Sequence, residues 1–525
     1  MKTKTFREKA QACLPALKHW CMSPVGTVEP VEDPAAWQGV SMRPAGEKRS
    51  YGNGERVFFD FGEHAVGHVE LELALDGVDF DSPLFLRFLA AELPYEFSYR
   101  REEWTTWLSQ AWMQEDFVKY DTLPAKIRLP RRYAFRYLMV EVVATPNPIR
   151  FRKVRLRAES SAGRRLPPPP QGLPPLESQI WEAGVRTLRN CMQTVFEDGP
   201  KRDRRLWLGD LRLEALVNAV TYRNPRVVER SLYVLAAAME KDGIFPSCAY
   251  EGEMLGRHGA HAYEYPFLLP KILVEHIGFY QRRQVARDLY QTALLQFKRV
   301  EKDFDRDGLL HVPPPQWSVI DQNRTMDKTV ATHCAYIYGL EAMAQLSDLL
   351  GKPDAPSLRK HAAWLRKTAR AHWLQEDGFF ATDRETGRGD RTVASQVWAI
   401  LAEVVTGEEA ADLLKRTLAE ESLVAPMSPY LQHFLLEACR LVGNEEALHQ
   451  VLQRYWGAIL KTGASTFYEV FKMDDPFYSP YKQAWVNSAC HAWSCTPVFF
   501  LAHNARETPR GTPHPLPLKP TTHSP

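Results

Sequence analysis

A proline-rich stretch separates two parts of this chain that have different hydrophobic patterns. Residues 163–177 read GRRLPPPPQGLPPLE, and prolines this closely spaced exclude a helix and favour an extended, semi-rigid connection. Apolar residues alternate with polar ones before this stretch and recur at helical spacing after it. A chain of 525 residues is long enough for two or three packed units. We therefore predict two domains of different class, joined by a linker at 161–176.

The first part has the pattern of an antiparallel β-sandwich. The run RVFFDFGEHAVGHVELELAL from Arg56 is followed by the turn signal Asp76-Gly77. Three further segments alternate in the same way, namely LFLRFLAAEL, FRYLMVEVVA and FRKVRLRAES. These strands predict a sandwich domain over 51–160. Residues 1–50 show no stable period, so we expect an irregular N-terminal arm with one short helix at most.

The second part predicts about twelve helices. They fall near 177–195, 208–222, 226–240, 263–280, 282–302, 328–350, 355–373, 391–406, 407–419, 426–441, 444–461 and 484–503. Six inner and six outer helices would form an (α/α)6 barrel over 177–505. A superhelical solenoid would need a recurring signature of about 33 to 45 residues, and the sequence has none. The tail at 506–525 is rich in proline and poor in apolar residues, which predicts disorder.

Composition excludes several classes of function. The net charge is +2 and the basic residues form no long block, which argues against nucleic acid as a partner. No apolar run is long enough to span a bilayer, and the first twenty residues are not typical of a secretory signal. We therefore expect a cytoplasmic protein. The eight cysteines include no C-x-x-C pair, so neither a disulfide framework nor a metal site is predicted, and no cofactor is implied.

The densest group of chemically active residues lies between two predicted helices. The segment DGPKRDRRLWLGD, residues 198–210, holds three carboxylates, four cations and a tryptophan. Glycoside cleavage needs two carboxyl groups, one to protonate the leaving oxygen and one to activate water or attack the sugar. Aromatic rings can also cover the apolar faces of a sugar. A charged, solvent-exposed connection is the alternative interpretation, and composition alone does not decide between the two.

Two later segments carry further candidates. GASTFYE at 463–469 ends in an acid, Glu469, after a turn and two aromatic residues that include Tyr468. AWVNSACHAWSCTP, from 484, contains Trp485 and His491. A solvent-facing glutamate and a hydrogen-bonded core histidine are the structural alternatives for Glu469 and His491.

Together these segments resemble family 78 of the glycoside hydrolases, the bacterial α-L-rhamnosidases. The resemblance includes the strand VFFDFGEHAVGHVEL and YAFRY at 133–137, and it runs from about Arg56 to Leu501. That family places a β-sandwich before an (α/α)6 barrel. The barrel loop of the family reads approximately Asp-x-Pro-x-Arg-x-Glu-Arg-x-Gly-Trp-x-Gly-Asp, and the present loop is one residue shorter. The general acid of the family is the Glu, and Arg204 occupies its aligned position here.

The resemblance assigns expected roles to individual residues. Glu469 matches the general base, and Asp203, one residue before the missing Glu, is our candidate for the general acid, with Asp198 and Asp210 as rivals. His491 matches a sugar-contacting histidine within Ser488–His491, and the segment Trp317–Asp321 resembles a barrel loop that carries aromatic residues to the site. The full set of expected substrate-binding residues is Asp198, Arg202, Trp207, Asp210, Trp317, Asp321, Tyr468, Trp485 and His491.

The function that follows is inverting hydrolysis of a terminal sugar from a glycan or glycoside, in the manner of an α-L-rhamnosidase. One alternative is another exo-glycosidase or a polysaccharide lyase on the same barrel, since a fold hosts many reactions. A lyase could use Tyr263, Tyr265 and His261. A second alternative is a carbohydrate-binding protein that has lost its acid at position 204.

Overall fold

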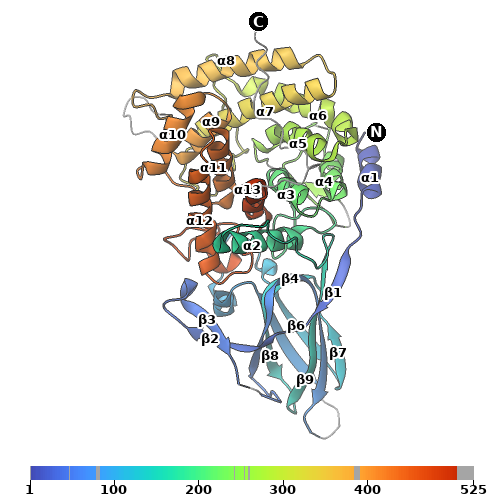
Figure 1. The fold of residues 1–525 in the computed structure, drawn as a ribbon. Helices are drawn as coiled ribbons and strands as arrows, with labels where there is room; N and C mark the ends of the chain where they lie inside the picture. The colour runs from blue at the N-terminus through green and yellow to red at the C-terminus, as the bar shows by residue number, and fades with distance from the viewer. Residues whose placement is uncertain are drawn as a thin grey trace.

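The computed structural model describes residues 2–46, 48–77, 83–241, 243–252, 255–257, 261–382 and 391–504. It consists of an N-terminal antiparallel β-sandwich and a C-terminal barrel of helices, which confirms the predicted fold class (Figure 1). None of the helices in these ranges combines the length and the apolar character that crossing a bilayer requires. The predicted tail at 506–525 lies outside the described residues.

The sandwich is built on one long strand. β4 (Arg56–Leu75) pairs with β8 (Tyr133–Ala144) through its first half and with β9 (Ile149–Ser160) through its second. The change of partner falls at Gly67, where a Cβ atom would lie 2.1 Å from the carbonyl oxygen of Arg157, so only glycine fits there. The alternating apolar residues of these strands form a separate buried core.

Three strands of the sandwich come from the part of the chain that we expected to be irregular. β1 (Lys18–Met22) pairs with β9, and β2 (Gly26–Glu32) pairs with β3 (Val40–Pro44) and β4. The expectation of an irregular arm over residues 1–50 is therefore wrong for residues 18–44. Alternation of apolar and polar residues did not predict these strands, because most of their residues are half-buried or exposed and form no apolar face. The other strands are β5 (Leu84–Ala91), β6 (Glu115–Tyr120) and β7 (Ala125–Arg128).

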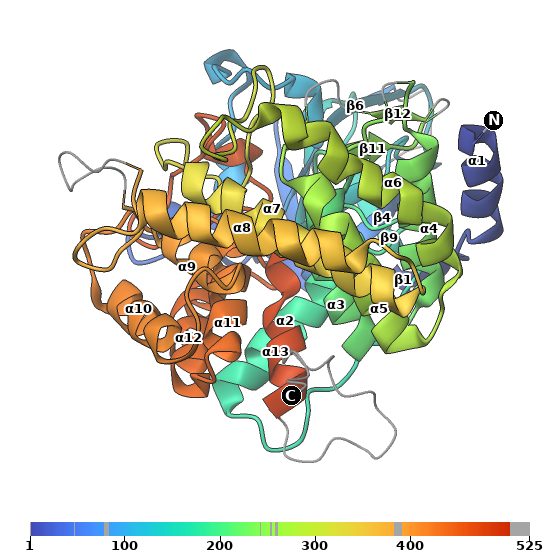
Figure 2. The ribbon, with the colours of Figure 1, turned by 90° about the horizontal axis from the view of Figure 1, so that it is seen from above.

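The chain begins on the other domain. Helix α1 (Lys2–Ala12) packs against α4 (Pro225–Ala237) of the barrel, with Phe6 stacked on Tyr233 at 6.2 Å between ring centroids (Figure 2). From there the chain runs down into the sandwich (Figure 1).

The barrel contains twelve α-helices within the described ranges. In Figure 1 the outer helices pass from α2 at the bottom through α4, α6, α8, α10 and α12, around inner helices that are more completely buried. The inner helices pack in order, α3 on α5, α5 on α7, α7 on α9 and α9 on α11. The remaining bounds are α2 (Pro175–Cys191), α3 (Leu208–Val220), α5 (Leu269–Tyr280), α6 (Gln284–Val300), α7 (Thr329–Leu349), α8 (Ala355–Trp373), α9 (Val393–Leu401), α10 (Gly407–Ala419), α11 (Pro429–Leu441), α12 (Glu445–Lys461) and α13 (Pro497–Asn504).

The last predicted helix is much shorter than expected. We predicted 484–503, but the α-helix spans only Pro497–Asn504. The backbone before it forms hydrogen bonds with distant loops instead: the His491 amide donates to Phe467 and the Ala492 amide to Asp198. Because these groups are already paired, the segment forms only the short 3-10 helices Ala484–Val486 and Ala492–Cys495 instead of an α-helix. His491 lies between them and lines the pocket described below.

Candidate active site

A deep pocket of about 660 Å³ opens where the loops of the barrel meet one segment of the sandwich. This volume lies within the range of small-molecule sites. Nine of the eleven predicted site residues line the pocket: Asp198, Arg202, Asp203, Trp207, Asp210, Trp317, Asp321, Glu469 and His491. Tyr468 and Trp485 do not. The structure thus brings the loop at 198–210 together with the later segments that carry Glu469 and His491.

Glu469 lies at the buried end of the pocket, with a side chain that is 3% exposed. Its two oxygens accept hydrogen bonds from Arg202 and from the hydroxyl of Tyr481. Burial opposes ionisation, but the Arg202 guanidinium, then His491 and the Tyr481 hydroxyl, together lower the pKa of Glu469 below its ordinary value of 4.5. Glu469 is therefore a carboxylate at neutral pH.

Arg202 connects the two proposed catalytic carboxyl groups. One terminal nitrogen forms the bond to Glu469, and the other donates to Asp203 at 3.3 Å. The guanidinium also lies 4.4 Å from the centroid of the Tyr481 ring. Asp203 and Glu469 thus stand on either side of one planar cation.

The three aspartates of the loop differ in the hydrogen bonds that their carboxyl groups already form. Asp198 accepts the Gly199 and Arg205 amides on one oxygen, at 2.7 and 3.0 Å, which closes the loop. Asp210 contacts the imidazole of His491 at 3.1 Å with one oxygen and accepts the Tyr265 hydroxyl at 3.4 Å with the other. Asp203 accepts only the Arg202 bond among the described residues.

Burial affects the protonation of these acids. It raises the pKa of Asp198 well above its ordinary value of 3.8, and the neighbouring Asp203 and Asp210 raise it further. Burial also raises the pKa of Asp210, although His491 opposes that change. Burial and the neighbouring carboxylates thus favour the protonated forms of Asp198 and Asp210.

Arg204, at the aligned position of the family's acid, points away from the pocket. Its backbone takes a left-handed conformation, with φ of 54°, and its side chain donates to the carbonyls of Pro200 and Arg132. The residues on either side, Asp203 and Arg205, both line the pocket. The Arg204 side chain therefore joins the loop to the sandwich, while its two neighbours line the pocket.

Local packing explains why the loop carries Trp207 and Gly209. Trp207 pairs with Cys248 in the short strands β10 (Leu206–Trp207) and β11 (Cys248–Tyr250), and β11 also pairs with β12 (Gly256–Arg257). A Cβ atom on Gly209 would lie 2.3 Å from the Tyr265 ring. Glycine at 209 thus allows Tyr265 to pack beneath the loop, against Trp207 and Asp210.

A buried network holds the loop at 198–210 on the sandwich. The Lys201 ammonium lies 2.6 Å from Glu96 and 3.7 Å from Glu92, and it donates to the carbonyls of Trp485 and Asn487. Glu96 follows β5 in the sandwich, whereas residues 485–487 belong to the barrel. One side chain of the loop therefore ties both domains together beneath the pocket.

Trp485 and Tyr468, which we expected to bind substrate, lie outside the pocket. The Trp485 indole donates to Ser98 at 2.9 Å and packs with Tyr99 in a cluster between the domains. The Tyr468 hydroxyl is hydrogen-bonded to Thr462 at 2.5 Å. Tyr468 directly precedes Glu469, and adjacent residues of an extended segment point in opposite directions. Trp485 lies in the 3-10 helix Ala484–Val486, away from His491.

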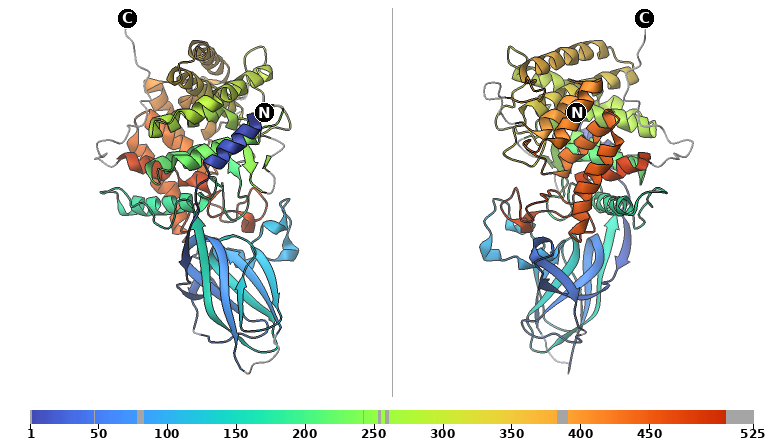
Figure 3. Two further views of the ribbon diagram at one scale, coloured as in Figure 1. Left: turned by 90° about the vertical axis from the view of Figure 1, so that its right-hand side faces the viewer. Right: turned by 60° about the vertical axis from the view of Figure 1, so that its left-hand side comes forward.

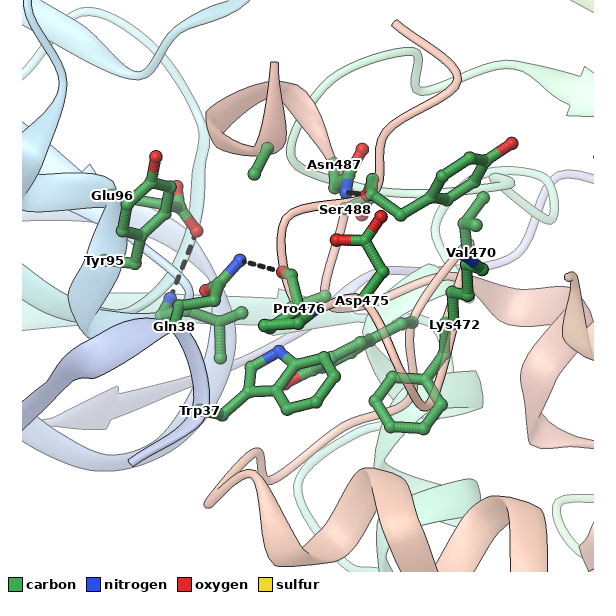
Figure 4. A pocket seen from close by; sticks show the side chains of 16 residues that line it. Trp37, Gln38, Tyr95, Glu96, Val470, Lys472, Asp475, Pro476, Asn487 and Ser488 are labelled. Atoms are coloured by element: carbon green, nitrogen blue, oxygen red, sulfur yellow. Dashed lines mark hydrogen bonds between the residues drawn. The ribbon is translucent and has the colours of Figure 1, made fainter. Parts of the chain in front are cut away.

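Tyr468 lines a second, much smaller cavity between the domains. Figure 4 shows Trp37, Gln38 and Tyr95 of the N-terminal part facing the loop that carries Asp475 and Pro476. The Gln38 amide donates to the Pro476 carbonyl at 3.0 Å. The free volume is about 20 Å³, enough for about one water molecule and not for a sugar.

Asp321 lines the pocket but already has a structural task. Its two oxygens accept the amides of Met427 and Ser428, each at 2.8 Å, and the Ser428 hydroxyl as well. Ser428 is the N-cap of α11. Asp321 therefore fixes the start of a barrel helix beside the pocket.

The residues that a lyase would need do not assemble. Tyr265 lines the pocket, but burial raises its pKa well above 10, which disfavours a phenolate base. The Tyr263 hydroxyl instead donates to Asp303 at 2.7 Å, and neither Tyr263 nor His261 lines the pocket. Within the described ranges, no group of three or more His, Cys, Asp or Glu side chains could hold a metal ion.

Sequence reasoning missed several residues of the pocket. Tyr481, Arg205, Arg324 and Trp493 line it, together with Trp107 and Trp112 from the segment between β5 and β6. Figure 3 shows that segment in light blue at the edge of the sandwich that faces the barrel. The three tryptophans in EEWTTWLSQAW at 102–112 were a usable signal, because aromatic rings can cover the apolar faces of a sugar.

Comparison with known proteins gives one consistent family. The model of the glycosyl hydrolase family 78 alpha-rhamnosidase N-terminal domain matches residues 24–158. The model of the bacterial alpha-L-rhamnosidase six-hairpin glycosidase domain matches residues 175–505. A search of curated protein sequences finds no match.

Solved structures agree with these two matches. A rhamnosidase from Klebsiella oxytoca with rhamnose bound is 33% identical, covers 95% of this chain and 98% of its own, and superposes with a TM-score of 0.91. A family 78 rhamnosidase from Bacillus sp. GL1 is 20% identical over 88% of this chain and 49% of its own, with a TM-score of 0.72. The Streptomyces avermitilis alpha-L-rhamnosidase complexed with L-rhamnose is 18% identical over 94% and 44%, with a TM-score of 0.67. The last two are similar in fold.

Proposed function

Since this chain belongs to family 78 of the glycoside hydrolases and is an α-L-rhamnosidase-like glycosidase, we propose that it releases a terminal α-linked L-rhamnose with inversion at the anomeric carbon. Glu469 is the general base and Asp203 the general acid. Rhamnose is the sugar bound by the Klebsiella oxytoca rhamnosidase, with which this chain shares nearly its whole length.

The state of Glu469 carries the proposal. A general base must be ionised at working pH and must reach a water molecule in the pocket. Burial opposes ionisation of Glu469, but Arg202, His491 and Tyr481 lower its pKa, and it lines the same pocket as Asp203. The Arg202 guanidinium separates the two carboxyl groups, and inverting enzymes need such a separation because a water molecule stands between the base and the sugar.

Asp203 is the proposed acid because its carboxyl group is the most available. Its side chain is 16% exposed, against 2% for Asp210, and both oxygens of Asp210 are engaged. Asp198 is the second candidate, since burial and its neighbours Asp203 and Asp210 give it the raised pKa that suits an acid. Against Asp198 stands its role in closing the loop.

The remaining polar residues of the floor would bind sugar hydroxyls. Asp198, Asp210 and His491 are buried side chains that still line the pocket. Trp207 and Trp493 offer ring surfaces for the apolar side of the sugar.

The general acid can be identified by comparing substrates whose leaving groups differ in their need for protonation. Asp203→Asn, Asp198→Asn and Asp210→Asn are compared on 2,4-dinitrophenyl and 4-methylphenyl α-L-rhamnosides. A dinitrophenolate leaves without protonation, so loss of the acid slows the methylphenyl substrate by about 10² to 10⁴-fold and the dinitrophenyl substrate far less. We expect this split for Asp203→Asn. The same split in Asp198→Asn, with equal effects on both substrates in Asp203→Asn, would transfer the role to Asp198.

A further inference from the structure

The rim of the pocket differs chemically from its floor. The floor is made of buried acids and His491, whereas the sandwich contributes two tryptophans to the wall. Trp107 is 62% exposed although it lines the pocket and lies 5.8 Å from the Tyr481 ring. An indole exposed at the mouth of a sugar pocket is a surface on which a further ring can stack.

An arginine guanidinium lies over the ring of each tryptophan of the rim. The guanidinium of Arg324 lies 5.9 Å from the Trp107 centroid, and that of Arg205 lies 5.8 Å from Trp112. Arg205 also lies 5.4 Å from the ring of Tyr250. Stacking of this kind holds a guanidinium in place and leaves its N–H groups at the ring edge free to bind.

Neither Arg205 nor Arg324 has an acidic partner among the residues that the structure describes. Other cations of the pocket are satisfied: Arg202 pairs with Glu469 and Asp203, and Lys328 donates to the carbonyls of Ser318 and Asp321. Two uncompensated guanidinium groups on one rim create a positive potential there, and a guanidinium binds a carboxylate through two parallel hydrogen bonds.

We propose that this rim is a leaving-group subsite for a ring that carries a carboxylate. The inference rests on the proposed function: rhamnose occupies the floor beside Asp203 and Glu469, and the group that departs lies on Trp107 and Trp112. Its carboxylate binds Arg205 or Arg324. A uronic acid residue and an aromatic acid share this chemistry.

The test compares matched leaving groups. 4-Carboxyphenyl and 4-carbamoylphenyl α-L-rhamnosides have nearly the same shape and differ in charge. A rhamnosyl uronic acid and its methyl ester form the corresponding sugar pair. For each pair, the ratio of kcat/KM for the charged over the neutral substrate is measured in the wild type and in Arg205→Gln/Arg324→Gln. Arg287→Gln is the control, because Arg287 is exposed on α6 outside the pocket.

We expect the charged-to-neutral ratio to fall by about three- to tenfold in the double variant and to stay constant in the control. In the wild type, 1 M NaCl should lower the same ratio, since exposed charges are screened. This measurement uses the wild type only, so it does not depend on whether the variant folds. A fall in the sugar pair alone identifies a uronate, and a fall in the aryl pair alone identifies an aromatic acid.

Stacking has its own control. Trp107→Ala should lower kcat/KM on both members of a pair by about tenfold, while Trp364→Ala, which removes an indole that is 48% exposed on α8, should not. If the charged-to-neutral ratio is the same in the wild type and the double variant and does not change with salt, the subsite inference is wrong, while the proposed function is unaffected. No hydrolysis of any rhamnoside would overturn the proposed function and this inference with it.

Discussion

Arg202 and Glu469 form a buried ion pair across the pocket, although 267 positions separate them in the sequence. The pair joins the loop before α3 to the segment after α12. Because the guanidinium helps to keep Glu469 ionised and also touches Asp203, the chemistry of the site depends on this one contact.

Replacement of the proposed base should stop the reaction and spare the fold. We expect Glu469→Gln to lower kcat on aryl α-L-rhamnosides by about 10² to 10⁴-fold, with an unchanged circular dichroism spectrum. Glu275→Gln is the matched control, because it weakens another Arg–Glu pair, with Arg212, outside the pocket. Turnover of Glu469→Gln at the level of the control would remove Glu469 from the mechanism.

The Tyr481 hydroxyl should influence the pH below which activity is lost. It donates to Glu469 and helps to lower the pKa of that carboxyl below 4.5. The base is active when ionised, so kcat/KM falls as pH drops through the pKa of Glu469. Tyr481→Phe removes the hydrogen bond, raises that pKa and should move the acidic limb of the pH profile to higher pH. An identical acidic limb in both proteins would show that Glu469 does not control it.

The sequence predicted those parts of the molecule in which a local period or motif is strong. Most of the barrel helices were predicted because helices such as α8 repeat buried apolar residues at intervals of three and four, at Leu358, Ala362, Leu365 and Ala369. Glu469 and the loop at 198–210 followed from motifs whose residues the fold does bring together.

Three features depended on long-range contacts that no local pattern carries. Strands β1 to β3 form because β4 and β9 offer them partners. Residues 484–496 form two short 3-10 helices instead of an α-helix, because distant loops take some of their backbone hydrogen bonds. Trp107 and Trp112 reach the pocket from the other domain, a placement that only the packing of sandwich against barrel decides.

Lys201 should be essential for stability. It is buried against Glu96, whose pKa burial raises to about 7 despite the lysine. Lys201→Met leaves Glu96 without its cation, whereas Glu92 keeps His64 at 2.9 Å. We expect the substitution to lower the free energy of unfolding by about 3 to 5 kcal/mol, measured by urea denaturation at pH 7. Lys153→Met, which removes a surface lysine 3.9 Å from Glu72, should change it by less than about 0.5 kcal/mol.

Glu214 should reduce stability at neutral pH. It is buried on α3, neither of its oxygens has a partner among the described residues, and burial, then Asp210 and Asp198, raises its pKa well above 4.5. A carboxyl group with a raised pKa favours the fold below pH 4.5, and that contribution is lost as pH rises. Glu214→Leu should therefore stabilise the protein by about 1 to 3 kcal/mol at pH 7 and flatten the fall in stability above pH 4.5. A melting temperature below that of the wild type at pH 7 would contradict this.

The anomer that forms first tests the mechanism most directly. Hydrolysis of an aryl α-L-rhamnoside is followed by proton NMR from the first minutes, before mutarotation mixes the anomers. With Glu469 activating water opposite the leaving group protonated by Asp203, β-L-rhamnose appears first and the α anomer grows in later. α-L-Rhamnose as the first product would contradict single displacement and the assignment of Glu469 as a general base.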